Sequence, residues 1–181
     1  MRCTSVLGKV KQVRISKKTQ NEFEEYIKKN EEKFYRIGYS YTKNADDALD
    51  IVQEAVLKAM SSIETLKTPD YFNTWFYRIL VNTALDFLRK KKRVFPAEEE
   101  FFSVNVEGRT DDYSDMDLQK VLGDLPENYK TIIILRFFED LKIQEIAKIL
   151  NLNENTVKTR LYKSLKILRI KLGDEEDINE L

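Results

Sequence analysis

The chain has 181 residues, of which 31 are lysine or arginine and 31 are aspartate or glutamate, so its formal net charge is zero. It has no histidine, which removes the commonest general base and metal ligand, and its single Cys3 cannot form an internal disulfide. No apolar run reaches the length of a membrane span, and no apolar segment follows the basic first residues as it would in a signal peptide. We therefore expect a cytoplasmic protein that is not an enzyme and has no cofactor or metal.

The zero total conceals blocks of one charge sign. Residues 1–18 carry six cations and no acid, and residues 89–93 read RKKKR. Residues 98–117 are acidic, with Arg109 as their one cation, and the last eight residues read DEEDINEL. Separated blocks of this kind suit a protein that touches DNA at two places and a different partner elsewhere.

Apolar residues at three- and four-residue spacing predict helices over residues 19–41, 45–60 and 71–92, then over 116–122, 126–139, 143–150 and 154–172. Gly38, inside the first helix, would allow close packing of a neighbouring helix. Residues 94–114 have no helical period and contain Pro96, Gly108 and clustered acids, which indicates a linker.

The expected fold class is therefore all-α, with two small helical domains joined by a flexible acidic linker. The expected domain bounds are a flexible basic arm at 1–18, a first domain at 19–93, the linker at 94–114, a second domain at 115–172 and an acidic tail at 173–181.

The helices expected over 143–150 and 154–172 are separated by only three residues. Asn151 suits the left-handed conformation that often ends a helix, and Asn153 suits the N-cap of the next one. Two helices joined in this way predict a helix-turn-helix, whose second helix can lie in the major groove of DNA.

The second of these helices has an apolar stripe opposite a basic side. The stripe comprises Val157, Leu161, Leu165 and Leu168, and the basic side comprises Lys158, Arg160, Lys163, Lys166 and Arg169. A basic side is often only solvated surface. The tight turn and the short polar residues at the start of the helix favour DNA binding, because such residues can read base edges while longer cations hold phosphates.

An aromatic segment, YFNTWFYR, opens the helix that ends in RKKKR. Aromatic faces stack on unpaired bases and cations follow the backbone, so the segment suits binding a single strand or opening a duplex. Phe72, Phe76 and Ile79 are expected in the core, whereas spacing alone leaves the faces of Trp75 and Tyr77 open. The RKKKR run equally suits a solvated helix end, where cations interact favourably with the helix dipole.

Acidic residues line one side of the helix expected over 45–60, at Asp46, Asp47, Asp50 and Glu54. A solvated face is one interpretation, and acids also suit the first turn of a helix. A catalytic carboxylate pair on an open helix would lack the burial that tunes such groups. Protein docking is the better functional interpretation, because these acids would repel nucleic acid.

Three separated motifs resemble one family. They are DALDIVQEAVLKAM (47–60), YFNTWFYRILVNTALDFLRKKKR (71–93) and LPENYKTIIILRFFEDLKIQEIAKILNLNENTVKTRLYKSLKILR (125–169). In this order they resemble the extracytoplasmic-function (ECF) sigma factors, the two-domain group of the sigma-70 family of bacterial RNA polymerase. The resemblance implies that residues 19–93 are a sigma region 2 domain and that residues 115–172 are a sigma region 4 domain.

The resemblance also implies a role for each matched residue. Docking on the β′ clamp helices of core polymerase would involve Asp47, Asp50, Gln53 and Glu54, and Leu49 stands where the family often has an acid. Binding and melting of the −10 element would involve Trp75, Tyr77, Arg78, Asn82, Arg89, Lys90, Lys91, Lys92 and Arg93. Binding of the −35 element as duplex would involve Glu154, Asn155, Thr156, Lys158, Thr159, Arg160 and Lys163.

The implied function is to bind core polymerase, direct it to promoters and promote melting of the DNA. The implied partners are core RNA polymerase (β′ clamp helices and β subunit), promoter DNA and an anti-sigma factor, which in this family is often membrane-bound; no small-molecule substrate is implied. A stand-alone helix-turn-helix regulator is the main rival, and it leaves the Trp75 segment and the acidic face unexplained. An adaptor that binds polymerase but not DNA leaves the basic helix unexplained.

Overall fold

A computed structural model describes residues 17–66, 71–94 and 121–172, and its secondary structure in these residues consists of helices and turns without strands. This agrees with the predicted all-α class. The elements are α1 (Lys17–Thr42), α2 (Ala45–Ser62), η2 (Ile63–Thr65), α3 (Phe72–Val94), α5 (Glu127–Ile133), η5 (Ile134–Phe138), α6 (Ile143–Leu150) and α7 (Glu154–Lys171). The predicted basic arm, almost all of the linker, most of the helix at 116–122 and the acidic tail lie outside the described residues.

Helices α1, α2 and α3 pack together into the N-terminal half, with aromatic rings between α1 and α3. The rings of Phe34 and Phe76 have centroids 4.6 Å apart, and those of Phe23 and Phe72 are 5.6 Å apart. Ring pairs at such distances contribute about 0.5–1.5 kcal/mol beyond the area that they bury. The inner face of α2 is apolar and buried, and it comprises Ala48, Ile51, Val52, Ala55, Val56, Ala59 and Met60.

Gly38 lies where α1 crosses α2. A Cβ atom at this position would be 2.9 Å from the backbone oxygen of Ala48, which is closer than real Cβ contacts come. The predicted close helix packing at Gly38 is therefore confirmed, and its cause is the approach of the α2 backbone rather than of a side chain.

The C-terminal half contains α5, η5, α6 and α7, with α7 packed against both α5 and α6. Pro126 directly precedes α5, where its lack of an N–H has little cost. The predicted single helix over 126–139 is α5 continued by the π-helical turns of η5, which end at Phe138. The bounds predicted for the helix at 143–150 are those of α6.

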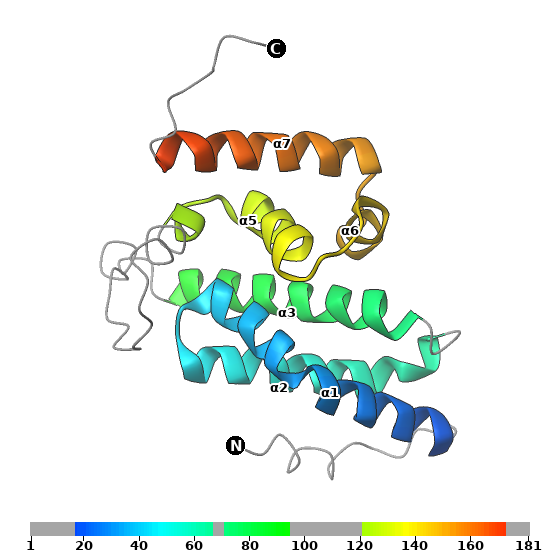
Figure 1. Cartoon of the computed structure of the whole chain (residues 1–181). Coiled ribbons are helices and arrows are strands. Elements are labelled where there is room, and N and C mark those ends of the chain that lie inside the picture. The colour runs from blue at the N-terminus through cyan, green and yellow to red at the C-terminus, as the bar shows by residue number, and fades with distance from the viewer. Residues whose placement is uncertain (1–16, 67–70, 95–120, 173–181) are drawn as a thin grey trace.

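The two halves are in contact. Figure 1 shows α3 between α1 and α2 on one side and α5 and α6 on the other, with α7 at the opposite face of the molecule. One continuous core cluster contains buried residues of both halves, among them Leu80 of α3 and Ile146 of α6. The hydroxyl groups of Tyr41 and Thr131 form a buried hydrogen bond of 2.7 Å between α1 and α5. The two described halves are therefore packed against each other in this conformation.

Candidate nucleic-acid and polymerase interfaces

The turn between α6 and α7 is fixed by two asparagines, as the sequence predicted. Asn151 has φ 53° and ψ 46°, the left-handed conformation, and the backbone N–H of Leu152 donates to the Ala147 oxygen at 2.9 Å. The side-chain oxygen of Asn153 accepts from the backbone N–H of Thr156 at 2.7 Å and so caps α7. These bonds set the angle between the two helices, and the helix-turn-helix is confirmed.

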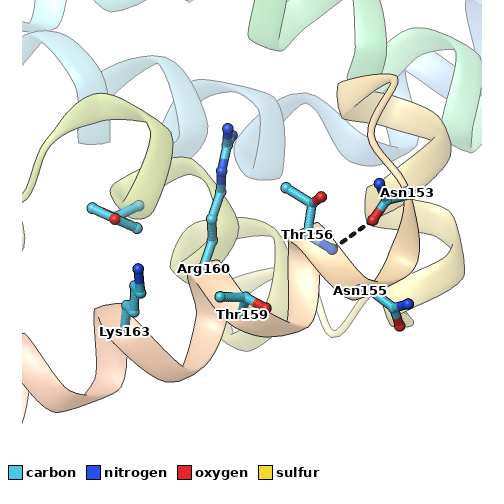
Figure 2. Close-up of a pocket in the computed structure, with 7 residues that line it drawn as sticks. Asn153, Asn155, Thr156, Thr159, Arg160 and Lys163 are labelled. Atoms are coloured by element: carbon cyan, nitrogen blue, oxygen red, sulfur yellow. Dashed lines mark hydrogen bonds between the residues drawn. The ribbon is translucent and has the colours of Figure 1, made fainter.

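The outer side of α7 presents polar side chains to solvent. Those exposed are Glu154, Asn155, Lys158, Thr159 and Lys163, while Thr156 and Arg160 are half-buried. A polar hollow on this helix is lined by Tyr129, Asn153, Asn155, Thr156, Thr159, Arg160 and Lys163. Figure 2 shows Thr156 and Arg160, one turn apart, extending from the same side of α7.

Tyr129 is the residue of this hollow that sequence reasoning missed. It belongs to α5, and no pattern in the sequence connects that helix with α7. A tyrosine hydroxyl beside two cations can donate to a phosphate oxygen. No spacing in the sequence signals the contact, because it depends on how α5 packs against α7.

The apolar stripe predicted for α7 was wrong at one position. Leu165 is exposed, and Ser164 is fully buried in its place. The inward positions are therefore 157, 161, 164 and 168. The Ser164 hydroxyl donates to the Arg160 backbone oxygen at 2.6 Å and lies 3.5 Å from that of Tyr129. A small residue is needed here because the α5 backbone comes close to α7.

The aromatic segment of α3 divides between core and surface. Tyr77 is only 3% exposed, and Trp75 is half-buried with its ring centroid 5.9 Å from that of Phe23. Arg78 and Asn82, one turn apart, are exposed. The structure thus assigns the two faces that spacing left open: Tyr77 points inward, and Trp75 lies at the margin of the core. The expected contact of Tyr77 with DNA stays a prediction.

Tyr77 donates a hydrogen bond to a carboxylate oxygen of Glu139, which follows η5 in the C-terminal half. Burial raises the pKa of Tyr77 far above its usual value, and the Glu139 carboxylate raises it further. Burial also raises the pKa of Glu139, although the hydrogen bond from Tyr77 and the charges of Lys33 and Arg36 oppose this shift. The pair therefore connects the two halves through a neutral phenol and a partly desolvated acid.

The basic end of α3 is partly occupied by acids of the protein itself. Arg89 and Lys90 are exposed, and Arg89 pairs with Asp86 at 3.1 Å. Lys91 pairs with Asp47 of α2 at 2.8 Å, and Lys92 pairs with Glu127 of α5 at 3.6 Å. Arg93 is exposed at the end of the helix. The RKKKR run therefore lies at a helix end, where its cations interact favourably with the helix dipole, as one of the two interpretations predicted. Its exposed cations are also accessible to phosphates.

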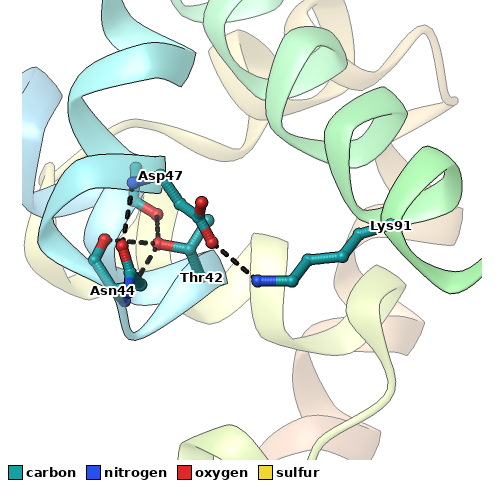
Figure 3. Close-up of polar contacts among 5 residues, drawn as sticks. Thr42, Asn44, Asp47 and Lys91 are labelled. Carbon is teal, nitrogen blue, oxygen red and sulfur yellow. Dashed lines mark hydrogen bonds and ion pairs between the residues drawn. The ribbon is translucent and has the colours of Figure 1, made fainter. Parts of the chain in front are cut away.

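The acidic side of α2 is divided as well. Asp50 and Glu54 are exposed, Gln53 is half-buried, and Glu54 pairs with Lys58 within the helix at 3.5 Å. Figure 3 shows Asp47 turned towards Lys91, with its backbone N–H donating to the Asn44 side chain at 2.9 Å. Asp47 therefore connects α2 to α3, and the outward acidic side consists of Asp46, Asp50 and Glu54.

Lys130 of α5 is a charged side chain at the junction of the two halves. It is only 7% exposed, and its ammonium group lies 5.8 Å from the centroid of the Tyr41 ring. Burial lowers the pKa of Lys130 to about 8; the nearby charge of Lys43 adds to this shift, and Glu127 opposes it. The contact surface between the halves thus contains a partly destabilised charge.

None of the helices in residues 17–66, 71–94 and 121–172 is both long enough and apolar enough to cross a membrane. Within the same residues, no group of three or more potential ligands is placed to hold a metal ion.

Comparison with known proteins identifies the class to which this architecture belongs. The family model for sigma-70 region 2 matches residues 26–94, and the model for sigma-70 region 4 matches residues 115–168. The chain is therefore an RNA polymerase sigma factor of the sigma-70 family, with the two regions in the predicted order.

Individual relatives narrow the group. The chain is 54% identical over 150 residues to RNA polymerase sigma factor SigV of Bacillus subtilis, covering 83% of this chain and 90% of that protein. It is 33% identical over 184 residues to ECF RNA polymerase sigma factor SigW of the same organism, covering 92% and 96%. The chain belongs to the ECF sigma factors, as the motifs in its sequence indicated.

Solved structures agree on the fold. The sigma factor RpoE, in complex with the anti-sigma factor NepR from Bartonella quintana, matches with a TM-score of 0.73 at 21% identity, covering 86% of this chain and 99% of that one. CnrH, in complex with the cytosolic domain of CnrY, matches with a TM-score of 0.65 at 19% identity, covering 86% and 90%.

Proposed function

We propose that this sigma factor binds core RNA polymerase, directs it to specific promoters and promotes melting of the DNA for transcription initiation. The observation that carries the proposal is the match of both sigma-70 regions in order, together with a relative of 54% identity that covers most of the chain. The protein contributes contacts rather than covalent chemistry, and the polymerase carries out RNA synthesis. Its place of action is the cytoplasm, where core polymerase and promoter DNA are found.

Helix α7 reads the −35 element as duplex DNA. Its capped start projects from the tight turn with Glu154, Asn155 and Lys158 exposed, which suits contacts to base edges in the major groove. Arg160 and Lys163 line the hollow beside Tyr129, which suits phosphate contacts that set the register of the helix.

Helix α3 binds and melts the −10 element. Arg78 and Asn82 are exposed on it, and Trp75 offers part of a ring face at the margin of the core. Aromatic stacking on unpaired bases favours the open strand over the duplex, so contacts made only after melting shift the equilibrium towards the open state. The cations from Arg89 to Arg93 follow the backbone of that strand.

Helix α2 docks on the β′ clamp helices of core polymerase through Asp50, Gln53 and Glu54. Asp50 and Glu54 lie one turn apart and exposed on its outward side, where their negative charges suit a basic partner surface, and the half-buried Gln53 lies beside Glu54. Asp47 contributes by orienting this helix against α3, because its carboxylate is held by Lys91. Region 4 would make a further contact with the β subunit.

An anti-sigma factor is a further proposed partner. The two solved structures that share this fold are both sigma factors in complexes, one with the anti-sigma factor NepR and the other with the cytosolic domain of CnrY. This supports the same kind of regulation here.

The test is run-off transcription by purified core polymerase, with and without this protein, on templates that carry random upstream sequences. We expect transcripts that depend on the protein, and sequencing of the active templates should reveal two conserved blocks. Binding to core polymerase without any dependent transcript would overturn the proposal in favour of an adaptor. A specific duplex footprint in the absence of polymerase, without core binding, would favour the stand-alone regulator.

A further inference from the structure

Helix α7 has an exposed apolar flank. Tyr162 is 71% exposed, Leu165 is 37% exposed and Leu172 is 43% exposed. Steps of three and seven residues place these side chains in one row along the helix. Figure 1 shows α7 at one face of the molecule, and a different side of this helix packs against α5 and α6. The described residues leave the row uncovered, and contiguous exposed apolar side chains are typical of a docking surface.

Cations border this row. Lys158, Lys166 and Arg169 are exposed, and each lies one helical turn from a member of the row. Within the described residues these three cations form no ion pair, whereas Lys171 on the same helix pairs with Asp124 at 3.0 Å. The flank therefore suits an occupant that brings both acids and an apolar side chain.

The segment that follows α7 in the sequence has this composition. Residues 174–181 of the acidic tail read DEEDINEL, with five acids, no cation, and the apolar residues Ile178 and Leu181. The tail lies outside the described residues. Its charge is opposite to that of the three cations, and its apolar residues suit the exposed row.

The tail is long enough to cover the flank. Along the helix axis, Tyr162 lies about 15 Å and Lys158 about 21 Å before Leu172. Eight extended residues reach about 27 Å. Gly173 has no Cβ atom and therefore suits the turn that would direct the tail back along α7.

An extended tail also comes into register with the flank. Ile178 would lie about 16 Å from the turn, level with Tyr162. Glu180 would lie about 23 Å from the turn, level with Lys158. The four acids before Ile178 would lie along the last turns of α7, beside the two other cations of the flank.

Covalent attachment favours the tail over a separate molecule as the occupant. A segment joined to its site by a short link is present there at an effective concentration on the order of millimolar. A second copy of the chain would need to reach that concentration to displace the tail.

We propose that residues 174–181 fold back onto this flank, with Ile178 packed against Tyr162 and Leu165 and the acids beside the three cations, and that the docked tail competes with DNA for α7. The competition rests on the proposed function of α7 in duplex binding. The docking depends only on the chain itself and can be tested without DNA or polymerase.

The docked tail weakens duplex binding without covering the whole helix. Its carboxylates take the place of phosphates on the same cations, so the two contacts exclude each other. Arg160 and Lys163 lie on another side of α7, in the hollow beside Tyr129, and stay open. Because the displaced contacts are made by cations, the tail lowers the affinity for duplex of any sequence and so limits binding of the free protein to non-promoter DNA.

Methyl NMR of the full-length chain tests the docking. We expect nuclear Overhauser contacts between the methyl groups of Ile178 and Leu165, and none between those of Ile178 and Ile170. Ile170 is the matched control, because it is 53% exposed and closer to the tail in sequence but lies off the row. Absence of the contact to Leu165, or equal contacts to both residues, would overturn the docking. In a sample of two differently labelled copies, contacts between copies would overturn it in favour of a dimer.

Duplex binding tests the competition. The full-length charge variant Glu175→Gln, Glu176→Gln is compared with the control Glu25→Gln, Glu31→Gln, which removes two charges from α1. Fluorescence anisotropy reports binding to a random-sequence 20-base-pair duplex. We expect the charge variant to bind on the order of threefold more tightly than the control, since exposed ion pairs are weak. Ile178→Ser keeps every charge but loses the apolar contact, and it should also bind more tightly than the unmodified chain.

Equal affinities in both comparisons would overturn the competition. A gain in the charge variant without one in Ile178→Ser would overturn it as well, because the acids would then act on DNA at a distance rather than through a docked tail. Failure of the transcription test with the contact between Ile178 and Leu165 present would overturn the sigma function and leave the docked tail standing.

Discussion

At the scale of single residues, Lys130 is a buried charge that its surroundings at the junction between the halves disfavour. A lysine with a lowered pKa is charged in the unfolded chain at pH values where the folded environment disfavours that charge. The groups around it are the Tyr41 ring of α1, Lys43 directly after α1, and Glu127 from its own helix. Below about pH 8, Lys130 is charged in both the folded and the unfolded chain, so the folded protein bears the full cost of the buried charge. This cost to the free energy of folding declines as the pH rises from about 8, the pKa of Lys130 in the folded protein, towards 10.5, its usual pKa.

We therefore predict that Lys130→Met, which removes the charge and keeps much of the apolar stem, is more stable than the unmodified chain near pH 7.5. The advantage should shrink by roughly 1–2 kcal/mol by pH 9.5, below the range in which the buried tyrosines titrate. Thermal unfolding of both proteins across this range measures the difference. If the difference in stability between the two proteins did not change with pH, the charge of Lys130 would not destabilise the folded protein.

At the scale of elements, the crossing of α1 and α2 depends on the missing side chain of Gly38. We predict that Gly38→Ala destabilises the protein by about 1–3 kcal/mol, because the added methyl group meets the Ala48 backbone, which cannot move as a flexible side chain could. Urea unfolding gives the change in free energy.

Gly123→Ala is the matched control for Gly38. A Cβ atom there would have no neighbour within 4 Å, so the same substitution should be nearly neutral or slightly stabilising. Equal losses at both positions would show that steric contact is not the cause at Gly38.

Helix α7 gives a prediction about DNA. Replacing both Arg160 and Lys163 with alanine should weaken promoter binding by holoenzyme and lower the slope of log affinity against log salt by about 2, since each phosphate contact contributes roughly 0.9. Lys28→Ala with Lys29→Ala removes two exposed cations of α1 and should leave the slope unchanged. Titrations at several salt concentrations measure it; an unchanged slope in the α7 variant would remove both residues from the phosphate contacts.

These elements also show which features of the fold and of the candidate site could be predicted from the sequence. The helices and the two asparagines of the turn follow from local chemistry, so periodicity predicted the described helical segments to within about two residues at each end, and capping predicted the turn. The burial of Ser164 in place of Leu165 depends on the approach of the α5 backbone, and the contribution of Tyr129 to the α7 hollow depends on the same packing. The motif resemblance gave roles to Tyr77 and Lys92, but pairing across the junction has no local signal, and so neither partner could be predicted.

At the scale of the whole molecule, the C-terminal half covers one side of α3, the helix proposed to bind the −10 strand. Promoter opening is therefore expected to depend on whether the two halves can separate. Lys33 of α1 lies near enough to Glu139 for its charge to lower the pKa of that carboxyl, and the adjacent Phe138 is 57% exposed. Cysteines at positions 33 and 138, in a Cys3→Ser background, provide attachment points on the two halves for a long, flexible bis-maleimide that contains a reducible disulfide. Such a bridge holds the halves together without altering α7 or the outward side of α2.

We predict that the bridged protein still associates with core polymerase, because Asp50 and Glu54 stay exposed, but does not open promoters. Permanganate reactivity of unpaired thymines at the −10 element measures opening, and reduction of the bridge should restore it in the same sample. The two single-cysteine variants, treated with the same reagent, control for modification of either position. Permanganate-reactive thymines with the bridge intact would show that α3 can take a strand while the halves remain together, since the bridge leaves no other route to separation.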